Sequence, residues 1–292
     1  MVKPDPATPS LFADAPQRPD AEPSFVPGPE PGAGDLRRDF ADRDALVAYC
    51  RETFRDAAGV DDHVSPFRGG RSVAEAALDR VDPAAYGRTR NKLDGAVTRL
   101  SPYLRGGVLD LAETRDAVLE KASKSAASKL VQELAWRDFY QRVLAEVGTG
   151  VWDDLEDWKT GHPEADYDEA MPDDVARGET GIDFVDASAK ELAETGYLHN
   201  QMRMKVAAYL VHWRHVHWRA GARWFLTHLL DGDEASNNLS WQWVASTFGH
   251  KPYIFNAGNL HKVSEGRFDG TDAEGHNTFA GSYDDLNAKL FD

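Results

Sequence analysis

The sequence predicts an all-α fold, with one main helical domain over residues 36–292 and an N-terminal tail over residues 1–35. Apolar residues recur at helical spacing along most of the chain. No run of alternating β-branched residues indicates a strand, and no glycine-rich strand-to-helix turn of the dinucleotide type occurs. Hydrophobic residues make up 41% of the 292 residues, which is enough to bury a core.

The tail, residues 1–35, is rich in proline and acidic residues and shows little apolar periodicity. Such a segment cannot bury enough apolar surface to offset the entropy lost on ordering. We therefore expect it to be disordered.

Helical spacing begins near Asp39, where Leu46, Tyr49, Cys50 and Phe54 fall on one face. The same spacing predicts further helices at 72–80, 107–120, 125–148, 183–196, 198–219, 221–230 and 237–247. Residues 149–180 are rich in Asp, Pro and Gly and are predicted to form a long loop between two helical halves.

The formal net charge of −16 does not favour nonspecific attraction to nucleic acid, unless positive charge gathers on one face. Abundant carboxylates also suit a halophilic protein, since they keep a surface hydrated at high salt. Cys50 is the only cysteine, so the chain has no internal disulfide and no thiolate metal site. No apolar run would span a bilayer and no secretory signal pattern occurs, which predicts a soluble cytoplasmic protein without a membrane partner.

Two segments combine side chains that suit ligand binding. Thr98 and Ser101 stand before a turn, where hydroxyls and backbone N–H groups can hold phosphate, although the same residues also serve as helix caps. The helix 125–148 carries a polar and aromatic face of four residues, Glu133, Trp136, Arg137 and Tyr140. That face suits a stacked base and equally suits an amphipathic helix with an internal salt bridge.

A third segment is acidic and precedes an aromatic helix. Asp231 and Asp233 flank a glycine, but the closing Glu of a calcium loop is missing, so we predict no metal site. Trp241 and Trp243 stand two apart and point to nearly opposite sides of a helix. The chain has eight tryptophans, which suit either a core or a row of oxidisable indoles.

In order and spacing, these segments resemble the FAD-binding half of DNA photolyases and cryptochromes. The resemblance runs from about Phe67 to Asn256, through TGIDFVDA at 180–187, ETGYLHN at 194–200, DGD at 231–233 and WQWVAST at 241–247. It implies a multi-helix FAD-binding domain. The α/β antenna domain that precedes this region in full-length members is missing from the sequence, so we expect FAD and no antenna chromophore.

The resemblance also implies which residues hold FAD. Those for the phosphates and ribose are Tyr86, Thr98, Arg99, Leu100 and Ser101, with Val97 standing where the family often has a further Thr. Asp231 and Asp233 would lie by the flavin and ribitol, with Arg203 paired to Asp231. Asn237 would face flavin N5, where an amide stabilises the reduced form.

The lesion pocket of cyclobutane-dimer photolyases is matched by Glu133, Trp136, Asn200, Met204 and Trp243. This implies light-driven electron transfer from reduced FAD to a pyrimidine dimer in accessible or single-stranded DNA. Trp241 and Trp218 match two inner electron carriers, whereas the outer position shows no clear Trp, and Tyr167, Trp158 or another indole would substitute.

Two departures leave a sensory alternative open. Gln201 replaces an Arg frequent in the family, which weakens a contact to DNA phosphate. A local basic patch of Arg137, Arg142, Arg203 and Lys205 would compensate for it. Without repair activity, the same domain would act as a cryptochrome-like light or redox sensor.

Overall fold

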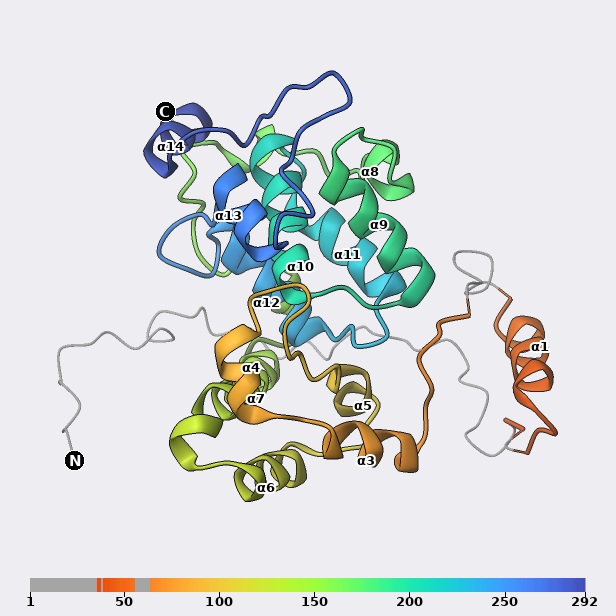
Figure 1. The fold of residues 1–292 in the computed structure, drawn as a ribbon. Coiled ribbons are helices and arrows are strands. Elements are labelled where there is room, and N and C mark those ends of the chain that lie inside the picture. The colour runs from red at the N-terminus through yellow and green to blue at the C-terminus, as the bar shows by residue number, and fades with distance from the viewer. Residues whose placement is uncertain (1–35, 38, 56–63, 292) are drawn as a thin grey trace. The chain divides into compact units, whose positions relative to one another are not determined.

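The computed structural model describes residues 36–37, 39–55 and 64–291 (Figure 1). The chain divides into two compact units, Met1–Cys50 and Arg51–Asp292. In the first unit, Phe40 lies just before helix α1 (Arg43–Thr53), and its ring is 5.2 Å from the ring of Tyr49 in that helix. The tail predicted to be disordered, residues 1–35, lies outside the described residues.

In the second unit the described secondary structure is helical, apart from one isolated bridge between Asp168 and Val216. This confirms the all-α prediction. The helices before the central loop are α3 (Arg71–Asp79), α4 (Pro83–Thr89), α5 (Ser101–Arg105), α6 (Leu111–Lys121) and α7 (Lys124–Val147). Those after it are α9 (Asp183–Thr195), α10 (Asn200–Ala208), α11 (Trp218–His228), α12 (Glu234–Ala245), α13 (Ala257–Val263) and α14 (Tyr283–Phe291).

Caps explain where the long helices begin and end. Helix α7 begins where Ser123 accepts the N–H of Ala126 at 3.3 Å. Helix α6 begins at Leu111 rather than at 107, because Asp110 caps it by accepting from Glu113 at 2.7 Å. Helix α9 ends at Gly196, whose left-handed φ of 68° suits glycine.

The predicted continuous helix 198–219 is wrong. Helix α10 continues into a π turn, Tyr209–Trp213, and the chain then leaves helical geometry at His215 with φ 48°. The neighbouring Val216 forms the bridge to Asp168, and α11 restarts at Trp218 with the His217 side chain as its cap. The break therefore depends on a distant loop as well as on local spacing.

The central loop contains more structure than predicted. Two short 3-10 turns, Gly148–Trp152 and Glu164–Asp166, and helix α8 (Asp173–Arg177) interrupt it. The short helices α4, α5, α13 and α14 were not predicted, since few turns give too little periodicity to detect.

Helix α12 is the centre of the C-terminal half, where it packs against α7, α10 and α11 (Figure 1). The main core is aromatic and includes Trp218, Phe184, Phe255 and Phe279, all fully buried. Three helices, α7, α10 and α11, therefore surround α12. No helix among the described residues is both long and apolar enough to cross a membrane.

Candidate functional site

A cavity of about 300 Å³ opens between α4, α5, α7, α10, α11 and α12. Most of the residues singled out in the sequence line it: Tyr86, Thr98, Ser101, Glu133, Trp136, Asn200, Arg203, Met204, Asp231, Asp233, Asn237 and Trp241. Four others do not line it: Arg99, Leu100, Trp218 and Trp243. The structure thus gathers residues separated by up to 155 positions into one site.

Asp231 lies on the floor of the cavity in a buried ion pair. Its Oδ2 accepts from the guanidinium of Arg203 at 2.9 Å, as the sequence predicted, and Arg203 Nε donates to the carbonyl of Leu198 at 2.7 Å. The other carboxylate oxygen, Oδ1, is buried and has no hydrogen-bond partner in the protein. Asp231 is thus oriented by one oxygen and offers the other to a donor.

Asp233 begins α12 and is held from two sides. Its Oδ1 accepts from the Ser236 N–H and from Gln141 of α7, each at 2.8 Å. Its Oδ2 lies 3.3 Å from Arg137 in an ion pair, yet makes no hydrogen bond. The contact of Gln141 was not predicted, because one glutamine on a polar helix face gives no sequence signal.

Asn237 presents an acceptor to the cavity. Its amide nitrogen donates to the carbonyl of Ala222 at 3.1 Å and to Asn238 Oδ1 at 3.0 Å. Both N–H groups are therefore used, and the amide oxygen is the polar atom that remains.

Several buried polar atoms of this cavity have no hydrogen-bond partner. Asp231 Oδ1, Asp233 Oδ2 and Ser236 Oγ are all buried without a hydrogen-bond partner, and all three residues line the cavity. Leaving one such atom unpaired costs about 1–3 kcal/mol. Three in one cavity favour a ligand that brings several hydrogen-bond donors.

Helix α7 forms one wall of the cavity. The predicted common face of this helix is confirmed, because all four of its residues line the cavity: Glu133, Trp136, Arg137 and Tyr140. Glu133 pairs with Lys129 on its own helix at 3.2 Å and with Arg90 after α4 at 2.8 Å. Trp136 is 46% exposed, so its ring is available at the rim. Burial raises the pKa of the Tyr140 hydroxyl.

Helix α10 places Asn200 beside Met204, with the Asn200 amide donating to the Met204 sulfur at 3.4 Å. Gln201 points elsewhere and donates to Asn91. Lys205 is fully buried over the Phe255 ring, and burial lowers its pKa to about 8.

The predicted basic patch is therefore wrong. Lys205 is inaccessible, and three guanidinium groups are paired with carboxylates: Arg137 with Asp233, Arg203 with Asp231, and Arg142 with Asp138.

The turn before α5 has a strained backbone. Thr98 Oγ1 accepts the N–H of Leu100 at 3.3 Å, and Arg99 has a φ of 52°, which is uncommon outside glycine. The Arg99 guanidinium lies 5.4 Å from the ring centre of Tyr197, and Arg99 lines a second cavity of about 510 Å³. The Leu100 side chain is buried in a small core with Tyr103. Arg99 and Leu100 can therefore shape the first cavity only through the backbone of this turn.

The two tryptophans of α12 point to different sides, as predicted. Trp241 is 2% exposed and its ring tip lies against Gly221 of α11. Trp243 is 41% exposed and lies against Tyr253, with 5.2 Å between ring centres.

Trp218 has a stacked partner that the sequence did not reveal. Its ring lies 6.4 Å from that of the half-buried Trp152, with 15° between the planes. Trp158 instead stacks on Tyr167 at 4.2 Å. Trp152 stands in a loop-rich segment where no periodicity indicates which residue it contacts.

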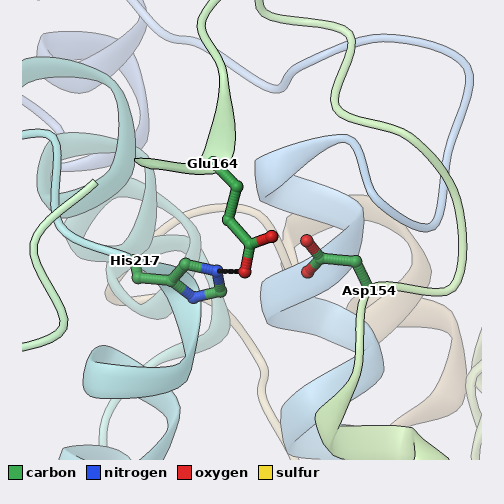
Figure 2. Close-up of side chains that lie close together, drawn as sticks. All are labelled: Asp154, Glu164 and His217. Carbon is green, nitrogen blue, oxygen red and sulfur yellow. Dashed lines mark hydrogen bonds and ion pairs between the residues drawn. The ribbon is translucent and has the colours of Figure 1, made fainter. Parts of the chain in front are cut away.

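Three side chains of metal-ligand type also lie together, Asp154, Glu164 and His217, with ligand atoms within 4.8 Å (Figure 2). Glu164 accepts from Arg219 at 2.7 Å and shares a 3.2 Å hydrogen bond with His217 Nε2. His217 Nδ1 accepts the Arg219 N–H, so Nε2 carries the proton, and burial lowers the pKa of this imidazole. The Arg219 guanidinium lowers the pKa of Glu164. The atoms of Glu164 and His217 that could bind a metal already make hydrogen bonds within the protein. The cluster is therefore better described as a hydrogen-bond network than as a metal centre.

In a comparison with known protein families, the model for the FAD binding domain of DNA photolyase matches residues 130–273. A deoxyribodipyrimidine photo-lyase of Halobacterium salinarum is 34% identical over 235 residues, which cover 76% of this chain and 48% of the relative. A deoxyribodipyrimidine photo-lyase of Streptomyces griseus is 40% identical over 155 residues, which cover 52% of this chain and 32% of the relative. A cryptochrome DASH of Natronomonas pharaonis is 34% identical over 202 residues, covering 63% and 41%.

Solved structures agree. A cryptochrome of Synechocystis superposes with a TM-score of 0.61 at 28% identity, over 69% of this chain and 44% of that one. An archaeal photolyase of Sulfolobus tokodaii with two FAD molecules superposes with a TM-score of 0.55 at 34% identity, over 68% of this chain and 45% of that one. The chain spans at most about half the length of these relatives.

Proposed function

Because the helical domain belongs to the FAD-binding domains of the DNA photolyase and cryptochrome family, we propose that the cavity around Asp231 binds FAD and serves light-driven repair of cyclobutane pyrimidine dimers. The observation that carries this is a set of buried atoms in the cavity that have no hydrogen-bond partner, Asp231 Oδ1, Asp233 Oδ2 and Ser236 Oγ. A flavin nucleotide brings matching donors in its ring imide N–H and its ribityl hydroxyls.

The residues present fit such a group. Asp231 and Asp233 would accept from the imide and ribityl donors, and Arg203 and Arg137 would hold the two carboxylates in place. Asn237 would accept from flavin N5–H through its amide oxygen, because both of its own N–H groups are used. This contact favours the protonated, reduced flavin.

The phosphate end would lie at the other wall. Thr98 and Ser101 bring hydroxyls to the cavity, and Tyr86 lies beside them. The strained turn at Arg99 supports a role in positioning these groups, since backbone strain often occurs at ligand sites. Arg99 and Leu100 would take part through their main chain.

The lesion would enter between α7 and α10. When bound and reduced, the flavin supplies one electron to the dimer under blue light and regains it after the ring bonds split. Glu133, whose carboxylate is ion-paired with Arg90 and Lys129, would accept from the imide N–H groups of the dimer, while the exposed ring of Trp136 offers a stacking face. Asn200 and Met204 would form the opposite wall, and Trp243 would bound the rim from outside the cavity.

Electrons would reach the flavin through a row of indoles. Trp241 lines the cavity, its ring packs against α11 at Gly221, and Trp218 stands one turn earlier on the same helix. Trp152 stacks on Trp218 and is half-buried, so we assign it the outer position that the motifs left open.

The cofactor is tested by the colour of the purified protein. We expect flavin absorption, and retention of FAD over flavin mononucleotide after denaturation and chromatography. A protein that stays colourless after incubation with FAD would contradict the proposal.

Repair is tested by illuminating the reduced protein with an oligonucleotide that contains a thymine dimer and following the recovery of thymine absorbance. Glu133→Gln and Glu133→Ala should keep flavin and lose most of the repair. Asp138→Ala, on the same helix but outside the cavity, is the matched control and should repair normally.

A second function, light or redox sensing without repair, is favoured by two observations. Trp243 lies outside the cavity, and the arginines at its wall are all ion-paired, which leaves little charge for a DNA backbone. Photoreduction of bound flavin without thymine recovery, on single-stranded or duplex substrate, would identify this function.

A further inference from the structure

One carboxylate, that of Asp154, accepts hydrogen bonds from two indoles. Asp154 Oδ1 accepts from Trp218 Nε1 and Oδ2 accepts from Trp158 Nε1, each at 2.6 Å. These distances are at the short end for hydrogen bonds to a charged acceptor, which are roughly twice as strong as neutral ones. Trp218 is fully buried, so Asp154 replaces water as the acceptor for its N–H.

The surroundings leave the charge of Asp154 available to the indoles. Of the two titratable neighbours in Figure 2, Glu164 is held by Arg219, and His217 is a neutral imidazole because burial lowers its pKa. Among the described residues, Asp154 makes no ion pair with a lysine or arginine. Its partners are therefore the two indole N–H groups.

We propose that Asp154 is the positioning residue and proton acceptor for Trp218 when this tryptophan is oxidised. The inference rests on the proposed light-driven electron transfer. The oxidant would be an excited, oxidised flavin. Trp241 would give it one electron, and Trp218 would then reduce the oxidised Trp241 with one electron. The indole Nε1–H bond of Trp218 breaks, its proton forms an O–H bond on Asp154 Oδ1, and Trp218 is left as a neutral radical.

The chemistry favours this transfer because removing an electron makes the indole N–H an acid comparable in strength to a carboxylic acid. The proton has only the 2.6 Å hydrogen bond to cross, with no rearrangement of either side chain. Reduction of Trp218, by Trp152 or by an added thiol, reverses the step: the electron returns to the ring and the proton returns from Asp154 to Nε1.

A protonated Asp154 also changes the second indole. Oδ2 loses charge when Oδ1 takes the proton, so the bond from Trp158 weakens at the same moment. Oxidation of Trp218 thereby changes the hydrogen bonding of Trp158, on which the Tyr167 ring is stacked at 4.2 Å.

The test is transient absorption of the flavin-loaded protein, in which the indole radical cation and the neutral indole radical have distinct spectra. The native protein should show the cation decaying to the neutral radical, more slowly in D₂O. Asp154→Asn keeps the size of the side chain but removes the base. It should lengthen the cation's lifetime by about tenfold or more, because a proton acceptor weaker by even one pK unit corresponds to a factor of about ten. Asp154→Glu should restore the decay in part.

The matched control is Glu164→Gln, which removes a neighbouring carboxylate that accepts from Arg219 and from no indole. It should change the lifetime by less than about twofold, the effect of a screened charge. Equal lifetimes in the native protein and in Asp154→Asn, or equal effects of the two variants, would overturn the proposal.

One readout separates this inference from the proposed function. The indole N–H resonances of Trp218 and Trp158 in ¹H–¹⁵N spectra need no flavin, and both should move upfield in Asp154→Asn; unmoved resonances would contradict the contacts. If the protein proves not to bind FAD, the proposed function fails, and these resonances still test the hydrogen bonds of Asp154 to both indoles.

Discussion

The cavity around Asp231 and the network around Asp154 both bring carboxylates next to aromatic rings, but the carboxylates differ in how many of their oxygens accept hydrogen bonds. In the cavity, one oxygen each of Asp231 and Asp233 lacks a hydrogen-bond partner, although that of Asp233 is ion-paired with Arg137. In the network, both oxygens of Asp154 accept from indoles. An unfilled site favours an external ligand, whereas a filled one suits chemistry between the protein's own groups.

The largest effect should come from breaking the ion pair on the cavity floor. Arg203→Ala leaves Asp231 charged, 4% exposed and without its partner, which should lower the free energy of unfolding by about 3 kcal/mol and lower flavin content. Urea denaturation measures the first and absorbance the second.

Arg142→Ala is the matched control for that change, since it breaks an exposed pair with Asp138 on α7. It should change the free energy of unfolding by less than about 0.5 kcal/mol. Equal losses in the two variants would mean that burial of Asp231 does not set the strength of its pair.

A smaller effect is expected where the cavity wall meets the tryptophan row. A Cβ added to Gly221 would overlap the ring tip of Trp241. Gly221→Ala should therefore lower the free energy of unfolding by about 2 kcal/mol, because overpacking forces side chains from their rotamers.

Gly69→Ala is the control for crowding, since a Cβ there meets nothing within 4 Å. We expect it to be nearly neutral in the same denaturation experiment. A neutral Gly221→Ala would show that Trp241 has room to move, and would weaken its assignment as a fixed carrier.

The cavity was largely predictable from the sequence, and the network was not. Spacing on one helix placed Glu133 and Tyr140 on a common face, and motif order placed Arg203 against Asp231. Asp154 and Trp152 stand in a segment without periodicity, and their partners are 64 and 66 positions away. Such contacts depend on how the loop packs on α11, which local spacing does not specify.

The helix break at His215 has the same cause. Apolar and aromatic residues continue through 198–219 at helical spacing, so the sequence predicts one helix. The bridge between Asp168 and Val216 and the caps of α11 overrule that spacing.

Acid should also destabilise the fold, through two buried histidines. Burial lowers the pKa of His199, which caps α10, and of His212 to about 4, below the 6.5 of an unfolded histidine. Between these values the unfolded chain binds more protons, so stability falls as pH falls, by about 1.4 kcal/mol per pH unit for each histidine.

Denaturation at a series of pH values from 7 to 4 measures this slope. His199→Asn keeps an N-cap side chain. It should reduce the slope of stability against pH by the contribution of about one proton. An unchanged slope would mean that His199 is protonated in the folded protein, and that its place beside α10 is more polar than its burial indicates.

The smallest effect should distinguish the two indoles that border Trp218. Trp152 stacks on the Trp218 ring directly, whereas Trp158 reaches it only through Asp154 and His217. Trp152→Phe should therefore reduce the yield of flavin photoreduction severalfold, equivalent to about 1 kcal/mol of barrier, and Trp158→Phe should reduce it less. Both variants keep an aromatic ring in place, so packing is nearly matched. A larger loss in Trp158→Phe would move the outer carrier to the Trp158–Tyr167 stack, and the carboxylate of Asp154 would then lie on the electron path between the two indoles it binds.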